Sequence, residues 1–145
     1  MSRESVALAL YNQISSAMIT AGAVKVSRRL LHWSDVEPAD QPAVFVAQGT
    51  QEPTWSKSGE PIIWRWNFSV YIYAHEADPT ASPSSKLNVL LDALEGALAP
   101  EAFSKKQTLG GTVVHCWING AVETDEGILG SQCMAIVPIE ILVTT

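Results

Sequence analysis

Apolar residues in the first segment of the chain recur at three- and four-residue spacing. Between Ser2 and Ala23 this stripe consists of Val6, Leu10, Ile14, Ala17 and Met18. Such spacing places them on one face of an α-helix of about five turns. Ser2 is a residue type that caps a helix N-terminus, and Gly22 is one that ends a helix. The pattern therefore predicts an amphipathic helix at the start of the chain.

A second stripe with helical spacing lies in the later half of the chain. It consists of Leu87, Leu90, Leu91, Leu94 and Leu98. The serines before it, Ser82, Ser84 and Ser85, offer several N-terminal caps, and Pro100 cannot continue the helix. We therefore expect a second helix with one clean apolar face.

The strongest strand signal is the alternation between Ile62 and Ala74. One face carries Trp64, Trp66, Phe68, Val70 and Ile72, and the other carries Arg65, Asn67, Ser69, Tyr71 and Tyr73. A period of two is typical of a half-buried strand. Thirteen residues would span roughly 40 Å at about 3.4 Å per residue. A strand of this length must bend or reach past its own core.

Four other segments are predicted to be strands. Val24 to Trp33 indicates a short strand interrupted by basic residues, and Ala43 to Ala47 a compact apolar one. Thr112 to Glu123 is a further strand region. Gln132 to Val143 is apolar on both faces and is expected to lie centrally in the sheet, with an irregularity at Pro138.

The connections leave two points open. Ser34 to Pro42 is predicted to be a surface loop, whereas Gln48 to Glu60 is either a broad hairpin tip or a flexible arm. Asn119-Gly120 is either a tight hairpin turn or a bulge in one long strand. The bulge is favoured because Asp125 to Gly130 supplies a better turn. The order of elements predicts an α+β fold, with a mostly antiparallel sheet of about five strands and two helices packed on one face.

Composition limits the classes of function. With 145 residues, of which 47% are hydrophobic, the chain is expected to form a single domain over residues 1–145. Fifteen acidic against nine basic residues give a net charge of −6. This balance disfavours affinity for nucleic acid or anionic membranes. The chain has no apolar run long enough for a membrane span and no signal-peptide pattern, which predicts a cytosolic protein.

The sequence contains few residues in arrangements typical of catalytic or metal-binding sites. The possible metal ligands are His32, His75, His115, Cys116 and Cys133. The adjacent pair His115 and Cys116 would point to opposite faces of a strand, so buried, inert cysteines are the favoured interpretation. Glu123, Asp125 and Glu126 lack the spacing of a calcium loop. No nucleophile elbow or phosphate-binding loop is present. We expect no enzymatic activity, no metal and no cofactor.

Surface aromatic and basic residues are the more informative feature. Trp55 and Lys57 lie in the polar segment Gln48 to Glu60, where a core role for tryptophan is difficult to arrange. Trp55 either folds back over the sheet or anchors an interface, since Trp is enriched at the energetic centres of protein contacts. The other candidate interface residues are Arg28, Arg29, Trp33, Arg65, Tyr71 and Tyr73.

Several stretches resemble the tail terminator, or tail completion, proteins of long-tailed bacteriophages. They run in order over nearly the whole chain: Arg28 to Val36, Gln41 to Phe45, Leu87 to Pro100, Gln107 to Gly111 and Ile136 to Ile141. None of these stretches is a chemical signature. The family's functional residues are therefore not transferred by position, and the candidate interface rests on the residues alone.

The resemblance implies a small α+β protein that assembles as a hexameric ring on the head-proximal end of the tail tube. The ring would end tube polymerisation and present a surface to the head connector. Its partners would be copies of itself, the tail tube protein and the connector or neck protein. DNA would pass through an acidic lumen without specific binding. The protein would be assembled in the host cytoplasm and end in the tail of the virion.

Two other functions compete with this one. A head-to-tail connector or neck protein would share the small size and the oligomerisation. A small ligand-binding α+β domain would instead contain a pocket with convergent polar groups.

Overall fold

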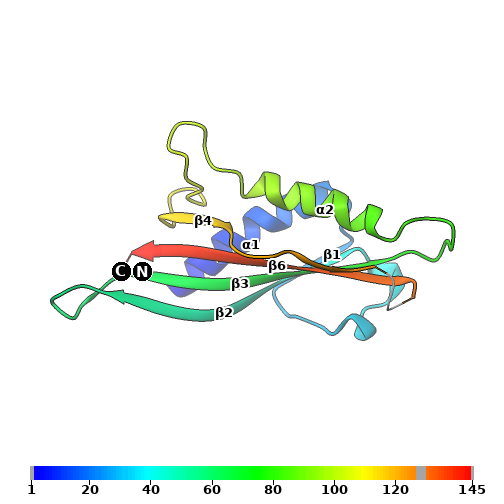
Figure 1. Ribbon diagram of the computed structural model, residues 1–145, viewed down its shortest axis with the longest axis horizontal. Helices are drawn as coiled ribbons and strands as arrows, with labels where there is room; N and C mark the ends of the chain where they lie inside the picture. Colours follow the sequence, from blue (N-terminus) through cyan, green and yellow to red (C-terminus); the bar gives the residue numbers. More distant parts are fainter. Residues whose placement is uncertain (1, 127–129, 145) are drawn as a thin grey trace.

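The computed structural model describes residues 2–126 and 130–144. Within them, two helices cover one face of a mixed sheet of six strands (Figure 1). In chain order, the elements are α1 (Arg3–Thr20), β1 (Lys25–Ser27), β2 (Ala43–Trp55), β3 (Pro61–His75), α2 (Ser84–Ala97), β4 (His115–Ile118), β5 (Glu123–Asp125) and β6 (Gln132–Thr144). The strand order is β1-β2-β3-β6-β4, and β5 also pairs with β6. Only β1 and β2 are parallel among these pairs. The predicted α+β class is confirmed.

Helix α1 forms as its apolar spacing predicts. The Ser2 hydroxyl accepts a hydrogen bond from the backbone N–H of Ser5, and Gly22 follows the helix with a φ of +108°. A positive φ is a conformation that glycine adopts without steric cost. Val6, Leu10, Ile14 and Met18 of the predicted stripe are buried. The helix is three residues shorter than predicted at its C-terminal end.

Helix α2 also follows its leucine stripe, but its cap differs from the prediction. The residue at the N-cap is Pro83, which makes no side-chain capping bond. The serines expected to cap the helix bond to each other instead, because the hydroxyls of Ser82 and Ser84 lie 3.0 Å apart. Burial of Leu87, Leu90 and Leu94 against the sheet holds the helix in place, which shows that packing outweighs the cap here.

The segment Gln48 to Glu60 is mostly strand. Strand β2 continues to Trp55 and stays paired with β3, and only Ser56 to Glu60 form the turn. The pairing register shifts between Gln48 and Gln51, where the backbones approach closely: a Cβ at Gly49 would lie 2.9 Å from the carbonyl oxygen of Asn67. The glycines and proline suggested a loop, but main-chain pairing with β3 holds the segment extended. The result is a long hairpin arm, defined here as residues 48–63, whose tip extends along the sheet beyond the helices (Figure 1).

Strand β6 is central, as predicted, with β3 on one side and β4 and β5 on the other. Ile118 pairs with Ile139 and Glu123 pairs with Ile136, so residues 119–122 lie opposite residues 137–138 only. The chain therefore does not reverse at Asn119-Gly120, and the bulge is confirmed over the hairpin. Pro138 lies at this interruption, where its missing N–H costs no ladder bond. This interruption divides the predicted strand in two and explains six strands instead of five.

Part of the predicted turn from Asp125 to Gly130 lies outside the described residues. The expected strand from Val24 to Trp33 is limited to β1. The remainder leads into the predicted surface loop, which contains two short 3₁₀ turns at Trp33–Asp35 and Pro38–Asp40.

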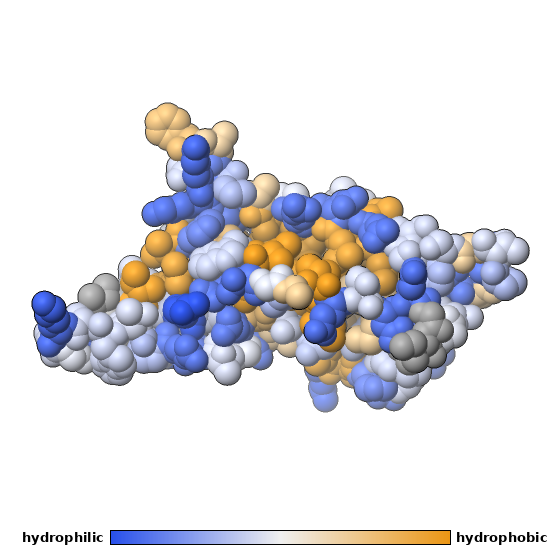
Figure 2. Space-filling view, viewed as in Figure 1, coloured by the Kyte–Doolittle hydropathy of each residue, from blue (hydrophilic) through white to orange (hydrophobic). Residues whose placement is uncertain are grey.

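Each face of the sheet has its own apolar cluster. The main core lies between the helices and the sheet and includes Trp66, Phe68, Val70 and Ile72 from β3. On the opposite face, Val36, Ala43, Phe45 and Tyr73 form a small second cluster. Figure 2 shows apolar side chains gathered along the junction of the helix layer and the sheet. Among the described residues, no helix is long and apolar enough to cross a membrane.

Candidate protein interface

The hairpin arm carries two of the predicted interface residues. Trp55 ends β2 and is 60% exposed, and Lys57 is exposed in the turn that follows. The Trp55 indole is therefore not buried against the sheet, and its role as an interface anchor stays a prediction. The turn is closed by a backbone hydrogen bond of 3.0 Å from Ser56 N–H to the Glu60 carbonyl. The arm thus presents a large aromatic side chain and a cation on a paired two-stranded scaffold.

Arg65 belongs to a polar network on the sheet face opposite the helices. Its Nε and Nη2 donate to Oε1 and Oε2 of Glu140 at 3.0 and 3.1 Å. Asn119 Nδ2 donates to the same carboxylate at 2.6 Å. The hydrogen bonds to Glu140 raise the pKa of Arg65 above its usual value. The Arg65 side chain stays 52% exposed while that of Glu140 is 4% exposed, so Arg65 is the member of this pair that a partner can reach.

The aromatic residues Trp33, Tyr71 and Tyr73 come together around the second cluster. They line a shallow depression of about 460 Å³ together with Leu30, Leu31, His32 and Met134. Tyr73 is buried, and its hydroxyl donates to the Leu31 carbonyl at 2.8 Å. Burial also raises the pKa of Tyr73. Tyr73 therefore packs within the chain, and Trp33 and Tyr71 are the half-buried members that a partner could contact.

The two predicted arginines differ in their surroundings. Arg28 forms an ion pair with Glu4 in the first turn of α1, and its hydrogen bond lowers the pKa of that carboxyl group. Arg28, a candidate interface residue, is therefore already paired with an acidic side chain of its own chain. Arg29 is exposed, and its backbone N–H donates to the Ser27 hydroxyl at 3.0 Å.

The predicted residues do not form one continuous site. Trp55 and Lys57 lie on the hairpin arm, whereas Arg65 lies on the open face of the sheet. The aromatic depression and the Arg28–Glu4 pair form two further separate places. The sheet register sets these residues apart. The order of residues along the chain does not reveal this separation.

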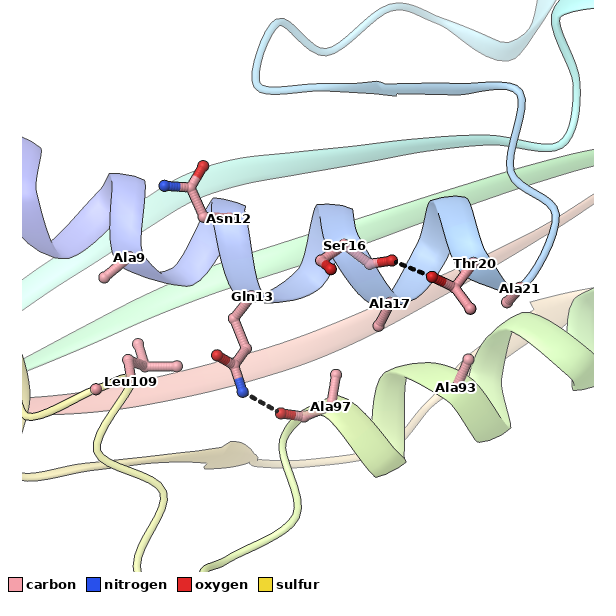
Figure 3. Close-up of a pocket in the computed structure, with 11 residues that line it drawn as sticks. Ala9, Asn12, Gln13, Ser16, Ala17, Thr20, Ala21, Ala93, Ala97 and Leu109 are labelled. Atoms are coloured by element: carbon pink, nitrogen blue, oxygen red, sulfur yellow. Dashed lines mark hydrogen bonds between the residues drawn. The ribbon is translucent and has the colours of Figure 1, made fainter.

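Two surface features were missed by sequence reasoning. The first is a groove of about 770 Å³ between α1 and α2 (Figure 3). It is lined mainly by small uncharged residues: Ala9, Asn12, Gln13, Ser16, Ala17, Thr20, Ala21, Ala93, Ala97, Leu109 and Gly110. Gln13 Nε2 spans the groove and donates to the Ala97 carbonyl at 2.9 Å. The signal in the sequence was the recurrence of alanine and serine at helical spacing beside each apolar stripe.

The second missed feature is Phe103, which is fully exposed in the loop between α2 and β4. The only signal was a lone aromatic residue within the polar stretch from Glu101 to Gln107.

Titratable groups within the described part of the chain do not gather into a reactive centre. No group of three or more His, Cys, Asp or Glu residues is placed there to hold a metal ion. Cys116 is buried, and burial raises the pKa of its thiol to about 12. Burial also raises the pKa of Cys133. Both thiols are therefore protonated at neutral pH, a state in which they are poor nucleophiles and metal ligands.

Comparison with known proteins yields a match in fold. No family model and no curated protein matches the chain by sequence. Among solved structures, it is similar to a chain of the virion of a native gene transfer agent (GTA) particle. The TM-score is 0.57 at 14% sequence identity, over 96% of this chain and 94% of that chain. The two chains therefore share one fold along almost their whole length.

Proposed function

We propose that this protein is a structural component of a phage tail that forms a ring, a hexamer, on the head-proximal end of the tail tube. The ring ends tube polymerisation and provides the surface to which the head attaches. The observation that carries the proposal is the fold shared, over 96% of the chain, with a chain of a gene transfer agent virion. The resemblance of five sequence stretches to tail terminators supports it.

The hairpin arm suits such a role. Tube capping needs a surface that reaches a neighbouring molecule, and the arm carries Trp55 and Lys57 beyond the helix layer. A tryptophan that stays 60% exposed in the isolated chain is the type of anchor that protein contacts bury. We assign the arm to contact with the tube. Arg65, Trp33 and Tyr71 remain candidates for contacts with the tube or with the connector.

The charge of the chain suits a channel for DNA. At −6, each subunit adds negative charge, and a lumen lined by acidic residues repels the phosphate backbone. DNA then passes without being held. A map of electrostatic potential on the assembled ring tests this part of the proposal, because a basic channel would contradict it.

The ring itself is tested by light scattering and electron microscopy on the purified protein, alone and mixed with tail-tube protein. We expect rings that bind one end of each tube and stop its growth. A protein that stays monomeric and leaves tube length unchanged would contradict the proposal. Rings that bind isolated connectors and ignore tubes would instead identify a neck protein.

A further inference from the structure

Arg3, in the first turn of α1, contacts both strands at the base of the hairpin arm. Its Nε donates to Oε1 of Gln51 on β2 at 2.9 Å. Its Cζ lies over two rings of β3, 5.2 Å from the ring centroid of Trp64 and 5.9 Å from that of Trp66. A guanidinium within about 6 Å of an aromatic ring is attracted to it. One side chain of the helix layer is thus attached to β2 and β3 at the same place.

These contacts lie just beyond the register shift at which the arm begins. Gln51 is the first residue of β2 that pairs with β3 after the shift, and its partner there is Trp66. An extra residue in one strand of a pair bends that strand and increases its twist. The direction in which the arm continues therefore depends on this point, which is the point that Arg3 contacts.

Strand pairing supports the two strands of the arm unequally. Strand β6 accompanies β3 as far as the pair of Ile63 with Thr144. Strand β1 accompanies β2 only to Phe45, and among the described residues no strand lies beside the outer edge of β2 after that. Beyond Phe45, β2 is therefore held by its pairing with β3 and by the contact with Arg3 from the helix layer.

The first turn of α1 is a firm base for this contact. Ser2 caps the helix, and the Glu4 carboxylate forms an ion pair with Arg28. The helix itself does not account for the position of Arg3, because a cation in the first turn opposes the helix dipole. The hydrogen bond and the ring contacts of Arg3 all involve the base of the arm, and they offset this unfavourable effect.

The exposed Trp55 lies on the side of the arm that Arg3 contacts. Gln51, Pro53 and Trp55 occupy every second position of an uninterrupted part of β2, and alternate residues of a strand face the same side. The pairing of Gln51 with the core residue Trp66 identifies this side as the one that the helices cover. A change in the angle of the arm at Arg3 therefore moves Trp55 toward or away from the helix layer.

We propose that Arg3 is a positioning residue, which fixes the angle of the hairpin arm and thereby the place at which Trp55 meets its partner. The inference rests on the proposed function, in which the arm contacts the tail tube. Arg3 acts through the arm and makes no contact with the tube itself.

The angle of the arm is measured by double electron–electron resonance between two spin labels. One label is attached at Thr54→Cys, exposed on the arm, and the other at Ile19→Cys, exposed on α1. The two native cysteines are buried, so they stay unlabelled in the native protein. We expect one narrow distribution of distances, which Arg3→Ala broadens. An unchanged distribution in Arg3→Ala would overturn the inference.

Two control variants define what Arg3 contributes. Arg3→Lys should give an intermediate distribution, because an ammonium keeps the attraction to the rings but lacks the rigid fork of the guanidinium. Arg29→Ala removes an exposed arginine elsewhere and should leave the distribution narrow. Equal broadening by Arg29→Ala would show that loss of any positive charge has this effect, which would also overturn the inference.

Capping assays on double variants separate positioning from stability. A cation–π contact at an exposed site changes an equilibrium about two- to five-fold. We expect Arg3→Ala to raise the protein concentration needed for half-maximal tube capping by that factor, with a melting temperature close to that of the wild type. In a Trp55→Ala background, Arg3→Ala should cause no further loss, because the arm then has no anchor to place. An equal loss in both backgrounds would overturn the inference.

Failure of the proposed function gives a different result. If the arm does not contact the tube, Trp55→Ala and Arg3→Ala both leave tube length unchanged. The spin-label distances still report whether Arg3 holds the arm, because that measurement needs no tubes. A broadened distribution together with normal capping by both variants would overturn the assignment of the arm to the tube and leave the hold of Arg3 on the arm standing.

Discussion

Arg65 on β3 and Glu140 on β6 lie on a diagonal of the sheet and are joined by two parallel hydrogen bonds. Glu140 is in register with Asn67, two residues from Arg65, and this offset lets the guanidinium reach both carboxylate oxygens. Asn119, at the interruption between β4 and β5, binds the same carboxylate. The network therefore ties β3 and β6 to the segment between β4 and β5, on the face that has no helices.

Removing the guanidinium should destabilise the protein. Arg65→Met leaves the buried Glu140 carboxylate with Asn119 alone, and an uncompensated buried charge is costly. We expect the urea midpoint to fall, while Arg29→Met at an exposed position leaves it unchanged. Adding Glu140→Gln should recover part of the loss, which a double-mutant cycle measures. Strictly additive effects of the two substitutions would show that the pair is not coupled.

The glycine at the strand interruption is required by its conformation. Gly120 has a φ of +123°, and a Cβ there would lie 3.2 Å from Cγ of Pro138. Gly120→Ala should cost about 1–3 kcal/mol in unfolding free energy. The control is Gly96→Ala in α2, where nothing lies within 4 Å of the added Cβ. It should stabilise the helix by about 0.5–1 kcal/mol. Denaturant unfolding measures the change in unfolding free energy for both variants. Equal changes would show that the Gly120 conformation does not exclude a side chain.

Stability should fall at alkaline pH. In the folded state, burial raises the pKa of the Cys116 thiol to about 12, compared with 9.0 for a free thiol, because the thiolate cannot be solvated in the core. Between these values the folded chain binds more protons than the unfolded chain, so the free energy of unfolding decreases as pH rises. Burial of Tyr73 acts in the same direction.

The measurement is the urea midpoint from pH 7 to pH 11. Cys116→Ala should be less stable at pH 7, because it leaves a small cavity, but its stability should decline less steeply above pH 9. Thiol reagents should label Cys116 only under unfolding conditions. Rapid labelling of the native protein at pH 8 would contradict the assigned protonation state.

The arm residue Trp55 should matter to assembly and not to folding. Because its side chain is 60% exposed, Trp55→Ala should change the melting temperature little. It should weaken tube capping, measured as tube length by electron microscopy, with Lys57→Ala giving a smaller effect in the same direction. A variant that loses thermal stability yet caps tubes normally would show that Trp55 serves the fold.

Local pattern was sufficient for most of the secondary structure. The stripes of α1 and α2, the alternation of β3 and the doubly apolar β6 each depend on burial with a fixed period, which the order of residues encodes directly. The bulge at Asn119-Gly120 was also predictable, because a better turn lies just beyond it. The extension of β2 to Trp55 was not, since backbone pairing with β3 overrides the glycine and proline of that segment.

The candidate interface depended on contacts between distant segments. Aromatic and basic composition identified Trp55, Arg65 and Tyr73, but only the packed chain exposes the first, pairs the second with Glu140 and buries the third. Similarly, the small residues of α1 and α2 become a groove only when the two helices lie side by side. Periodic burial is a local property of the chain, whereas a surface is made by residues far apart in sequence, and tertiary packing alone decides which of them meet.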